Sequence, residues 1–316
     1  MKRLLVAGLS LFLVLVLGYA AWSTWRDPLA ALPPPDTVPA LAESSSELRG
    51  GRRLEHVRLD ARGLGRIRIV VSLPEPPPNR KLPVVVVLGG LATGERSVHH
   101  IPDIGENVVI GYEWPIPARM PKGIGLLRHL PMLHDRVLSI PGQVATVIRW
   151  AQEQEWGDRS RISLLGFSLG ALAVPAAQRL AARDGIRIGW TVLAYGGAPL
   201  GALVEAQPKV RAHWFASALG HLADLVLWPV EPSAHLPHLT GRFLVLEGRD
   251  DAWIPAHAAA RLRELTPVPK QVVAFDGGHM GIGPAQEALL AAIIAESRAW
   301  LIRNGAVSAL SAGPES

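Results

Sequence analysis

The chain has 316 residues, of which 49% are hydrophobic, so it can bury the core of one large α/β domain. Its 32 basic and 27 acidic residues leave a net charge of only +5, and the arginines are scattered, which argues against a nucleic-acid-binding surface. The absence of cysteine excludes disulfides, thiolate zinc sites and a cysteine nucleophile.

The N-terminal segment, residues 1–26, predicts export. Two basic residues precede an uncharged, mostly apolar run over residues 4–22. As a helix this run would be about 28 Å long, close to the thickness of the hydrocarbon core of a membrane. Basic residues ahead of it would keep the N-terminus in the cytoplasm and place the rest of the chain on the periplasmic or extracellular side. We therefore expect a membrane anchor; the alternative is a cleaved signal peptide, with Gly18 and Ala20 at the cleavage site, and a secreted protein.

The predicted catalytic domain comprises residues 51–305, and three further segments lie beside it or at its start. Residues 27–50 are rich in Pro and Ser and lack apolar periodicity, which predicts a tether between membrane and domain. Residues 56–75 alternate apolar and polar side chains around the turn Arg62-Gly63-Leu64-Gly65, a pattern typical of a β-hairpin. Residues 306–316 are expected to form a flexible tail.

Short apolar runs alternate with helical patterns through the rest of the chain. This alternation predicts βαβ units with right-handed crossovers around a parallel sheet that is buried on both faces. The expected strands are Val84–Leu88, Asn107–Gly111, Ile162–Leu165, Trp190–Ala194, Phe243–Leu246 and Gln271–Phe275, and the expected helices are Val137–Glu153, Leu169–Arg183, Pro255–Glu264 and Pro284–Arg303. The apolar, aromatic and His-rich residues 200–240 interrupt the alternation and predict an insertion over the C-terminal edge of the sheet.

A glycine-rich loop follows the first of these strands, in "VVVVLGGLATGERS" (residues 84–97). The spacing from Gly89 to Gly94 matches the start of a phosphate-binding P-loop, but Glu95 and Arg96 stand where Lys and Ser or Thr are required. A carboxylate at that point would repel a phosphate, so a P-loop nucleotide hydrolase is disfavoured. Such a loop can instead present backbone N–H groups to a developing oxyanion, and the rest of the chain has to decide between the two roles.

The pentapeptide "GFSLG", residues 166–170, lies between an expected strand and an expected helix. This context predicts a nucleophile elbow, in which Ser168 is held in strained backbone geometry with its hydroxyl exposed. A Cβ at Gly166 or Gly170 would collide with the neighbouring strand or helix. The Leu169 N–H would lie at a helix N-terminus, where negative charge is favoured.

A serine nucleophile needs a base, and the base needs an orienting acid. Downstream, the strand in "RFLVLEGRDDAWIP" ends in Asp250 and Asp251, and the strand in "QVVAFDGGHMG" ends near His279. The order Ser, Asp, His, each at the C-terminal end of a strand, is that of the α/β-hydrolase catalytic triad. On spacing alone, either aspartate could be the acid.

On "GFSLG", "GRDDAWIP" and "GGHMG", the chain between about residues 56 and 303 resembles the α/β-hydrolase superfamily, of the dienelactone-hydrolase and serine-esterase type. The resemblance implies the α/β-hydrolase fold: a mostly parallel central sheet flanked by helices, with an N-terminal antiparallel hairpin and a small insertion over the active site. It implies Ser168 as nucleophile and His279 as base. The family pattern Gly-x-x-Asp-x-x-(Val/Ile)-Pro, which ends here at Pro255, indicates Asp251 as the acid.

The same resemblance implies where the oxyanion would bind. In this family the loop after the third strand supplies one backbone N–H, commonly from the residue after a His-Gly pair. Gly89-Gly90 stands at that place here, so the N–H of Leu91 is expected to act with that of Leu169, and the missing His departs from the family pattern.

Four residues are expected to contact the substrate. They are Gly90, Glu113 at another strand end, and Trp214 and Trp228, aromatic residues of the insertion. The two tryptophans could line an acyl pocket or pack the insertion onto the sheet, and Glu113 could be a substrate contact or a rim residue. The histidine pairs at 99–100 and 235–238 are poorly arranged for metal binding, so no metal is expected.

These observations predict an exported serine hydrolase that cleaves a small-molecule carboxylic ester through an acyl-enzyme, without a cofactor. A thioesterase or a peptidase of the same fold is an alternative within the enzyme class. A membrane-tethered, non-catalytic binding protein is the alternative outside it.

Overall fold

The computed structural model describes residues 27–101, 105–117, 124–208 and 210–309, together with residues 13, 14, 17, 18 and 21. The membrane anchor expected over residues 4–22 therefore lies almost wholly outside the described residues. Within the part of the chain that is described, no helix is long and apolar enough to cross a membrane.

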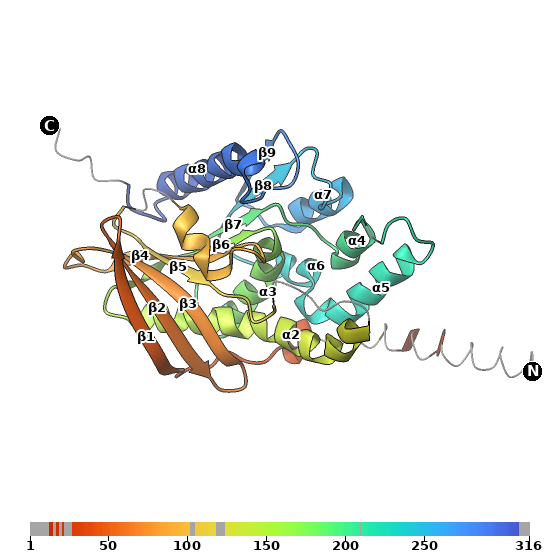
Figure 1. Cartoon of the computed structure of the whole chain (residues 1–316), viewed down its shortest axis with the longest axis horizontal. Coiled ribbons are helices and arrows are strands. Elements are labelled where there is room, and N and C mark those ends of the chain that lie inside the picture. Colours follow the sequence, from red (N-terminus) through yellow and green to blue (C-terminus); the bar gives the residue numbers. More distant parts are fainter. Residues whose placement is uncertain are drawn as a thin grey trace, which may run out of the picture.

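A nine-stranded mixed sheet forms the centre of the molecule (Figure 1). Its strand order is β1-β2-β3-β5-β4-β6-β7-β8-β9; β1, β2, β3 and β5 pair antiparallel, and every pair from β5 to β9 is parallel. The strands are β1 (Ala40–Arg49), β2 (Arg52–Ala61), β3 (Gly65–Pro74), β4 (Leu82–Leu88), β5 (Val108–Tyr112), β6 (Gly157–Phe167), β7 (Trp190–Ala194), β8 (Arg242–Gly248) and β9 (Lys270–Phe275). This is the α/β-hydrolase architecture expected from the sequence, with the hairpin formed by β2 and β3.

Helices cover both faces of the sheet (Figure 1). Helices α2, α3 and α7 pack on one face, whereas α8 and the short 3₁₀ helix η2 pack on the other. The helices are α2 (Ile124–Glu153), α3 (Leu169–Arg183), α4 (Leu200–Glu205), α5 (Ala216–Leu227), α6 (Pro232–His235), α7 (Ala256–Leu265) and α8 (Glu287–Arg303), with 3₁₀ helices η1 (Pro28–Ala31), η2 (Gly94–His100), η3 (Trp228–Val230), η4 (Leu236–His238) and η5 (Pro284–Gln286).

Side-chain alternation along the strands distributes residues between the two layers. Val84 and Val86 of β4 belong to the core on the α2 and α3 side, whereas Val85 and Val87 belong to the core beneath α8. All four are almost fully buried, which explains why the run is continuously apolar instead of alternating.

Each expected strand overlaps an observed one, but helix α2 starts 13 residues before the expected Val137, at Ile124. Pro131 and Pro141 lie inside this helix. Proline removes one backbone hydrogen bond and disfavours a helix interior, so the sequence pattern concealed the start of this helix. Its packing on the core begins at Met132 and Leu133.

The segment expected to be a tether, residues 27–50, is part of the folded domain. Leu29 of η1 and Leu32 are buried with exposed fractions of 5% and 4%, and they pack against α3 and η3. Residues 40–49 form the edge strand β1, which pairs with β2 although every one of its side chains is exposed. An edge strand held by backbone hydrogen bonds needs no apolar alternation, so the sequence carried no signal for it.

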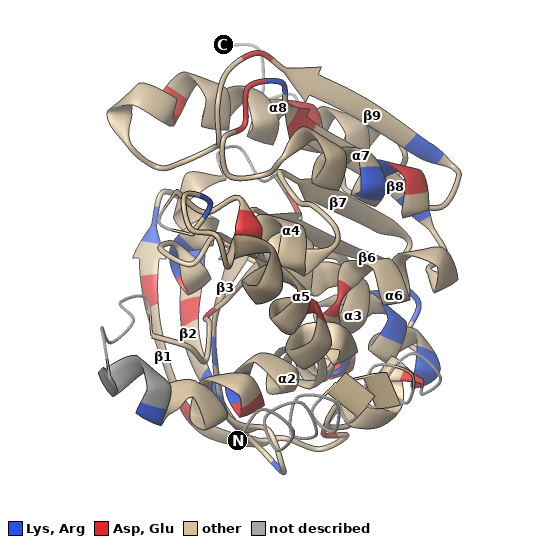
Figure 2. Cartoon of the chain, turned by 90° about the vertical axis from the view of Figure 1, so that its right-hand side faces the viewer, with Lys and Arg blue, Asp and Glu red and all other residues tan. Residues whose placement is uncertain are grey.

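The insertion expected at residues 200–240 is present between β7 and β8 and consists of α4, α5, η3, α6 and η4. Figure 2 shows α4 and α5 in front of the sheet in that view. The insertion packs on the side of the sheet that carries α3 and α7, through residues such as Leu200, Leu203 and Val230.

The end of the chain also differs from expectation. Ala306, expected in a flexible tail, is fully buried, and the N–H of Ser308 donates to Oδ1 of Asn107 at 2.8 Å. The tail from residue 310 lies outside the described residues.

Helix α3 crosses β4 at a distance that excludes any side chain at Gly170. A Cβ built on this glycine would lie 1.9 Å from the carbonyl oxygen of Leu88. We therefore expect Gly170→Ala to lower the free energy of unfolding by about 1–3 kcal/mol or more, because backbone must move. Urea denaturation measures the change; Gly189→Ala, whose Cβ meets nothing closer than 3.9 Å, is the matched control and should leave stability near that of the wild type.

Candidate active site

Ser168 lies at the sharp turn between β6 and α3. Its backbone has φ 53° and ψ −113°, a region that residues other than glycine rarely adopt. The N–H of Ser168 donates to the carbonyl oxygen of Ala194 at 2.9 Å, which ties the turn to the end of β7. A Cβ at Gly166 would lie 2.5 Å from the carbonyl oxygen of Gly170, so the turn can be this tight only with glycine there.

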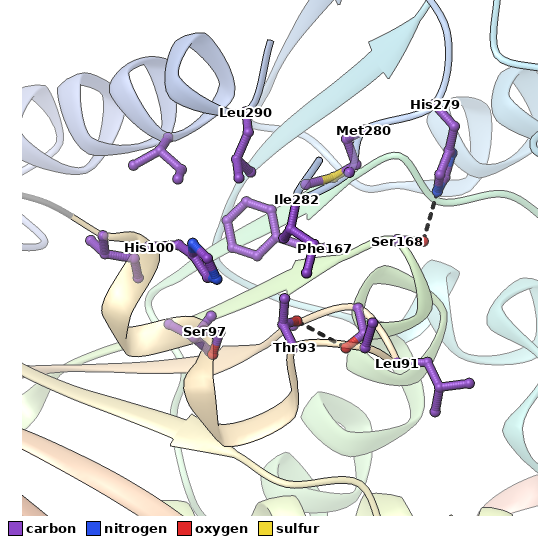
Figure 3. A pocket seen from close by; sticks show the side chains of 17 residues that line it. Leu91, Thr93, Ser97, His100, Phe167, Ser168, His279, Met280, Ile282 and Leu290 are labelled. Carbon is purple, nitrogen blue, oxygen red and sulfur yellow. Dashed lines mark hydrogen bonds between the residues drawn. The ribbon is translucent and has the colours of Figure 1, made fainter. Parts of the chain in front are cut away.

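The structure brings Ser168, His279 and Asp251 together. The Oγ of Ser168 lies 2.8 Å from Nε2 of His279, and Nδ1 of His279 lies 2.7 Å from Oδ2 of Asp251 (Figure 3 shows the first contact). Asp251 follows β8 and His279 follows β9, so all three side chains meet at the C-terminal edge of the parallel strands. The side chain of Asp251 is only 3% exposed and that of His279 is 16% exposed, so bulk water has little access to their contact.

Backbone N–H groups hold the Asp251 carboxylate in place. Its Oδ1 accepts hydrogen bonds from the N–H groups of Trp253 (2.8 Å) and Ile254 (3.0 Å), which leaves Oδ2 directed at His279. The neighbouring Asp250 is exposed, and its own N–H donates to the carbonyl oxygen of Gly277. The two aspartates, which spacing alone did not separate, thus occupy different environments.

Two aromatic rings flank the imidazole of His279. Tyr195 packs edge-on against it, with ring centroids 5.7 Å apart, and Trp253 lies tilted against it at 6.2 Å. Tyr195 is 1% exposed and has a positive φ of 57° at the end of β7. Burial, reinforced by the charge of Asp251, raises the pKa of the Tyr195 hydroxyl to about 12, so the group stays neutral.

Leu91 and Leu169, the residues expected to bind an oxyanion through their backbone N–H groups, both lie near Ser168. Leu169 is the first residue of the 15-residue helix α3, and Leu91 lines the same cavity as Ser168. Among the described residues, no acceptor receives a hydrogen bond from either N–H. The N–H of Leu169, at a helix N-terminus, is in an environment that favours negative charge, whereas that of Leu91 belongs to the glycine-rich loop before η2.

The glycine-rich loop after β4 packs against the carboxylate of Glu113. Gly94, at φ +48°, approaches Glu113 so closely that a Cβ would lie 2.5 Å from its Oε2, and the N–H of Glu95 donates to that oxygen at 3.3 Å. Burial, with the nearby charge of Glu113, raises the pKa of the Glu95 carboxyl. Glu113 therefore anchors the loop and is not among the residues that line the cavity beside Ser168.

A cavity of about 220 Å³ opens beside Ser168 (Figure 3). Gly90 lines it, but among the described residues none from the insertion does. Trp214 is 95% exposed and Trp228 lies in η3, where the chain packs against α2 and α3. The wall of the cavity is instead formed by the end of β6, η2, the segment after His279, and α8.

The remaining histidines do not assemble a metal centre in the described part of the chain, where no group of three or more metal-ligating side chains occurs. His235 is fully buried, and its Nε2 lies 2.8 Å from the carbonyl oxygen of Pro229. Burial lowers the pKa of His235 to about 4, so its imidazole is neutral at pH 7 and serves the packing of α6.

Sequence reasoning missed Tyr195, Trp253 and Phe167, which contact His279 or line the cavity. A signal for Tyr195 was present, because it stands at the end of a predicted strand directly before two glycines, where the other site residues also lie. Phe167 lies inside the recognised pentapeptide, but only the direction of its side chain shows that it faces the cavity.

No protein-family model matches the chain, and no curated protein sequence matches it. Solved structures do resemble it. Acetyl xylan esterase 1 from Thermoanaerobacterium sp. JW/SL YS485 superimposes with a TM-score of 0.60 at 14% identity, covering 88% of this chain and 93% of that one. The acetyl xylan esterase from Paenibacillus sp. R4 gives a TM-score of 0.59 at 17% identity, with the same coverage.

A cold-adapted esterase from an Arctic intertidal metagenomic library gives a TM-score of 0.56 at 16% identity, covering 84% of this chain and 98% of that one. At these identities the likeness establishes the fold, which is that of the α/β-hydrolase superfamily.

The Tyr195 hydroxyl is buried without a hydrogen-bond partner among the described residues, so we expect Tyr195 to stabilise the fold through the packing of its ring. We expect Tyr195→Phe to keep the stability of the wild type or exceed it by about 1 kcal/mol, because an unsatisfied polar group is removed. Tyr195→Ala should lower the free energy of unfolding by about 3–5 kcal/mol, because it leaves a cavity beside His279. Urea denaturation measures both; a Phe variant as unstable as the Ala variant would contradict this role for the ring.

Proposed function

We propose that the protein is a serine hydrolase that cleaves carboxylic esters of small molecules through an acyl-enzyme. The observation that carries the proposal is the continuous chain of contacts from Ser168 through His279 to Asp251, with distances of 2.8 and 2.7 Å. The esterases among the similar structures support ester cleavage as the reaction class. No cofactor is needed for this chemistry.

In the first step, Oγ of Ser168 attacks the ester carbonyl carbon while Nε2 of His279 takes the hydroxyl proton. The Asp251 carboxylate stabilises the imidazolium that forms, because its Oδ2 accepts from Nδ1 of His279. The negative charge moves to the former carbonyl oxygen, and the N–H groups of Leu91 and Leu169 would donate hydrogen bonds to it. Loss of one such donor typically raises the barrier by about 2.7–4 kcal/mol.

In the second half of the reaction, His279 returns its proton to the leaving alcohol, and the C–O bond breaks to give the acyl-enzyme. Water then attacks the acyl carbon with His279 as base, and Ser168 leaves as the proton returns to its oxygen. The flanking rings of Tyr195 and Trp253 keep the imidazole in one orientation through both steps.

The adjacent aspartates provide a direct test of the acid. We expect Asp251→Asn to lower kcat by about 10⁴-fold, because the amide cannot stabilise the imidazolium, and Ser168→Ala to abolish labelling by a fluorophosphonate probe. Initial rates on p-nitrophenyl acetate measure the first effect. Asp250→Asn is the matched control and should retain wild-type activity. Equal losses in the two Asn variants would refute the assignment of Asp251.

If the folded wild type neither labels nor hydrolyses any ester of a broad panel, the proposed function fails. The same fold would then serve as a non-catalytic binding protein.

We also propose that the chain is exported and held at the membrane by residues 4–22. The apolar run behind two basic residues supports this location. Asp27 caps η1 and pairs with Arg179, so the fold begins at residue 27. Residues 23–26 separate it from the apolar run, and four residues span at most about 14 Å. An anchored domain would thus lie close to the bilayer instead of on a long tether.

This location is tested by comparing the full chain with a chain that starts at residue 27. The full chain should sediment with membranes and resist extraction by high salt, because the apolar run is inserted, whereas the shorter chain should remain in the supernatant. Mass spectrometry of the purified N-terminus separates an anchor, which retains residues 1–26, from a cleaved signal peptide. An intact full chain in the cytoplasmic supernatant would contradict export.

A further inference from the structure

The cavity beside Ser168 extends along the face of the sheet that α8 covers. Phe167 and Val87 project from β6 and β4 into the core on this face, and Leu290 and Ile294 of α8 close the cavity from above. On the other side lies η2, a single short 3₁₀ helix of seven residues. Figure 3 shows the Phe167 ring among the side chains of His100, Ile282 and Leu290.

A second cavity of about 50 Å³ continues in the same layer beneath α8. Its floor is formed by Val85, Val109 and Leu165, which face α8 in the same way as Val87 and Phe167 do. The two cavities have three lining residues in common: Ile101, Phe167 and Ile294. Phe167 and Ile294 are 7% and 8% exposed, so their side chains are well packed at this boundary.

We propose that the cavity beside Ser168 holds an apolar chain of the ester, and that Phe167 and Ile294 set the maximum length of that chain by closing the cavity at its far end. This inference rests on the proposed ester hydrolysis and names the group that the site selects. Phe167 is here a specificity-determining residue, since it immediately precedes the nucleophile and stands between the two cavities.

The lining of the cavity favours an uncharged chain. It contains no Asp, Glu, Lys or Arg, and apart from Thr93, Ser97, Ser168 and two histidines its side chains are apolar, so burying a charged group there would be costly. The cavity volume of about 220 Å³ leaves room for a chain of several carbon atoms. Each methylene group that leaves water should raise kcat/KM by about fourfold until the cavity is full.

Chain-length profiles of kcat/KM test the proposal. Two panels are needed: p-nitrophenyl esters of straight-chain acids from two to fourteen carbons, and acetate esters of straight-chain alcohols over about the same range. The panel in which the wild type shows a maximum identifies whether the chain belongs to the acid or to the alcohol. In Phe167→Ala, which joins the cavities, the maximum should move to chains about two to four carbons longer, with a gain of about fourfold per added methylene.

Ile294 provides variants that do not adjoin Ser168 in the chain. We expect Ile294→Ala to lengthen the preferred chain and Ile294→Phe to shorten it, so that one position gives shifts of opposite sign. Ile293→Ala is the matched control, because Ile293 is fully buried on the same helix but lines neither cavity. It should lose stability as Ile294→Ala does and keep the wild-type profile.

A binding measurement separates failure of this inference from failure of the proposed function. Straight-chain alcohols from four to twelve carbons are titrated by calorimetry into Ser168→Ala, with and without Phe167→Ala, which requires no turnover. The strongest-binding chain should lengthen when Phe167 is replaced. Unchanged preferences in all the folded Phe167 and Ile294 variants would overturn the inference even if the wild type hydrolyses esters, whereas a shift in binding without any hydrolysis would support it and reject only the enzymatic role.

Discussion

The contact between the start of α3 and the strand beside it determines the geometry of the whole site. Gly170 lies so close to the carbonyl oxygen of Leu88 that only a hydrogen atom fits between them, and Gly166 approaches Gly170 with the same restriction. The helix can therefore begin directly after β6, and the chain must turn at Ser168 with a positive φ. That turn presents the serine hydroxyl to His279, and the N–H of Leu169 beside it has no acceptor in the described part of the chain.

The parallel sheet then gathers the other groups. Strands β8 and β9 end next to one another, so Asp251 and His279, which are 28 residues apart in the chain, are brought to hydrogen-bond distance. The site is supported from the side by Tyr195 at the end of β7 and by the loop that holds Trp253. Side chains on loops thus acquire fixed positions because the strands that precede them are rigid.

The sheet places the candidate catalytic residues and the cavity at two different locations. The groups expected to react lie at the C-terminal edge of the strands, whereas the cavity runs along the face beneath α8. Phe167 belongs to both, because it lies in β6 with its side chain on the α8 face and is followed by Ser168. The Glu113 carboxylate, in turn, holds the glycine loop and so stabilises the wall that carries Gly90 and Leu91.

Local patterns in the sequence determined the strands other than β1, most helices and the order of the candidate catalytic residues. Buried parallel strands are continuously apolar, and the elbow requires glycines at fixed spacing. They did not show that residues 27–50 belong to the fold, since an exposed edge strand is held by backbone hydrogen bonds that leave no apolar pattern. Nor did they show which aspartate meets His279 without the help of a family resemblance. They also left open whether Trp214 and Trp228 line a pocket or pack the insertion onto the sheet, and neither lines the cavity beside Ser168. Which side chains line a cavity depends on contacts between β6, η2 and α8, segments far apart in the chain, and only the tertiary structure decided those contacts.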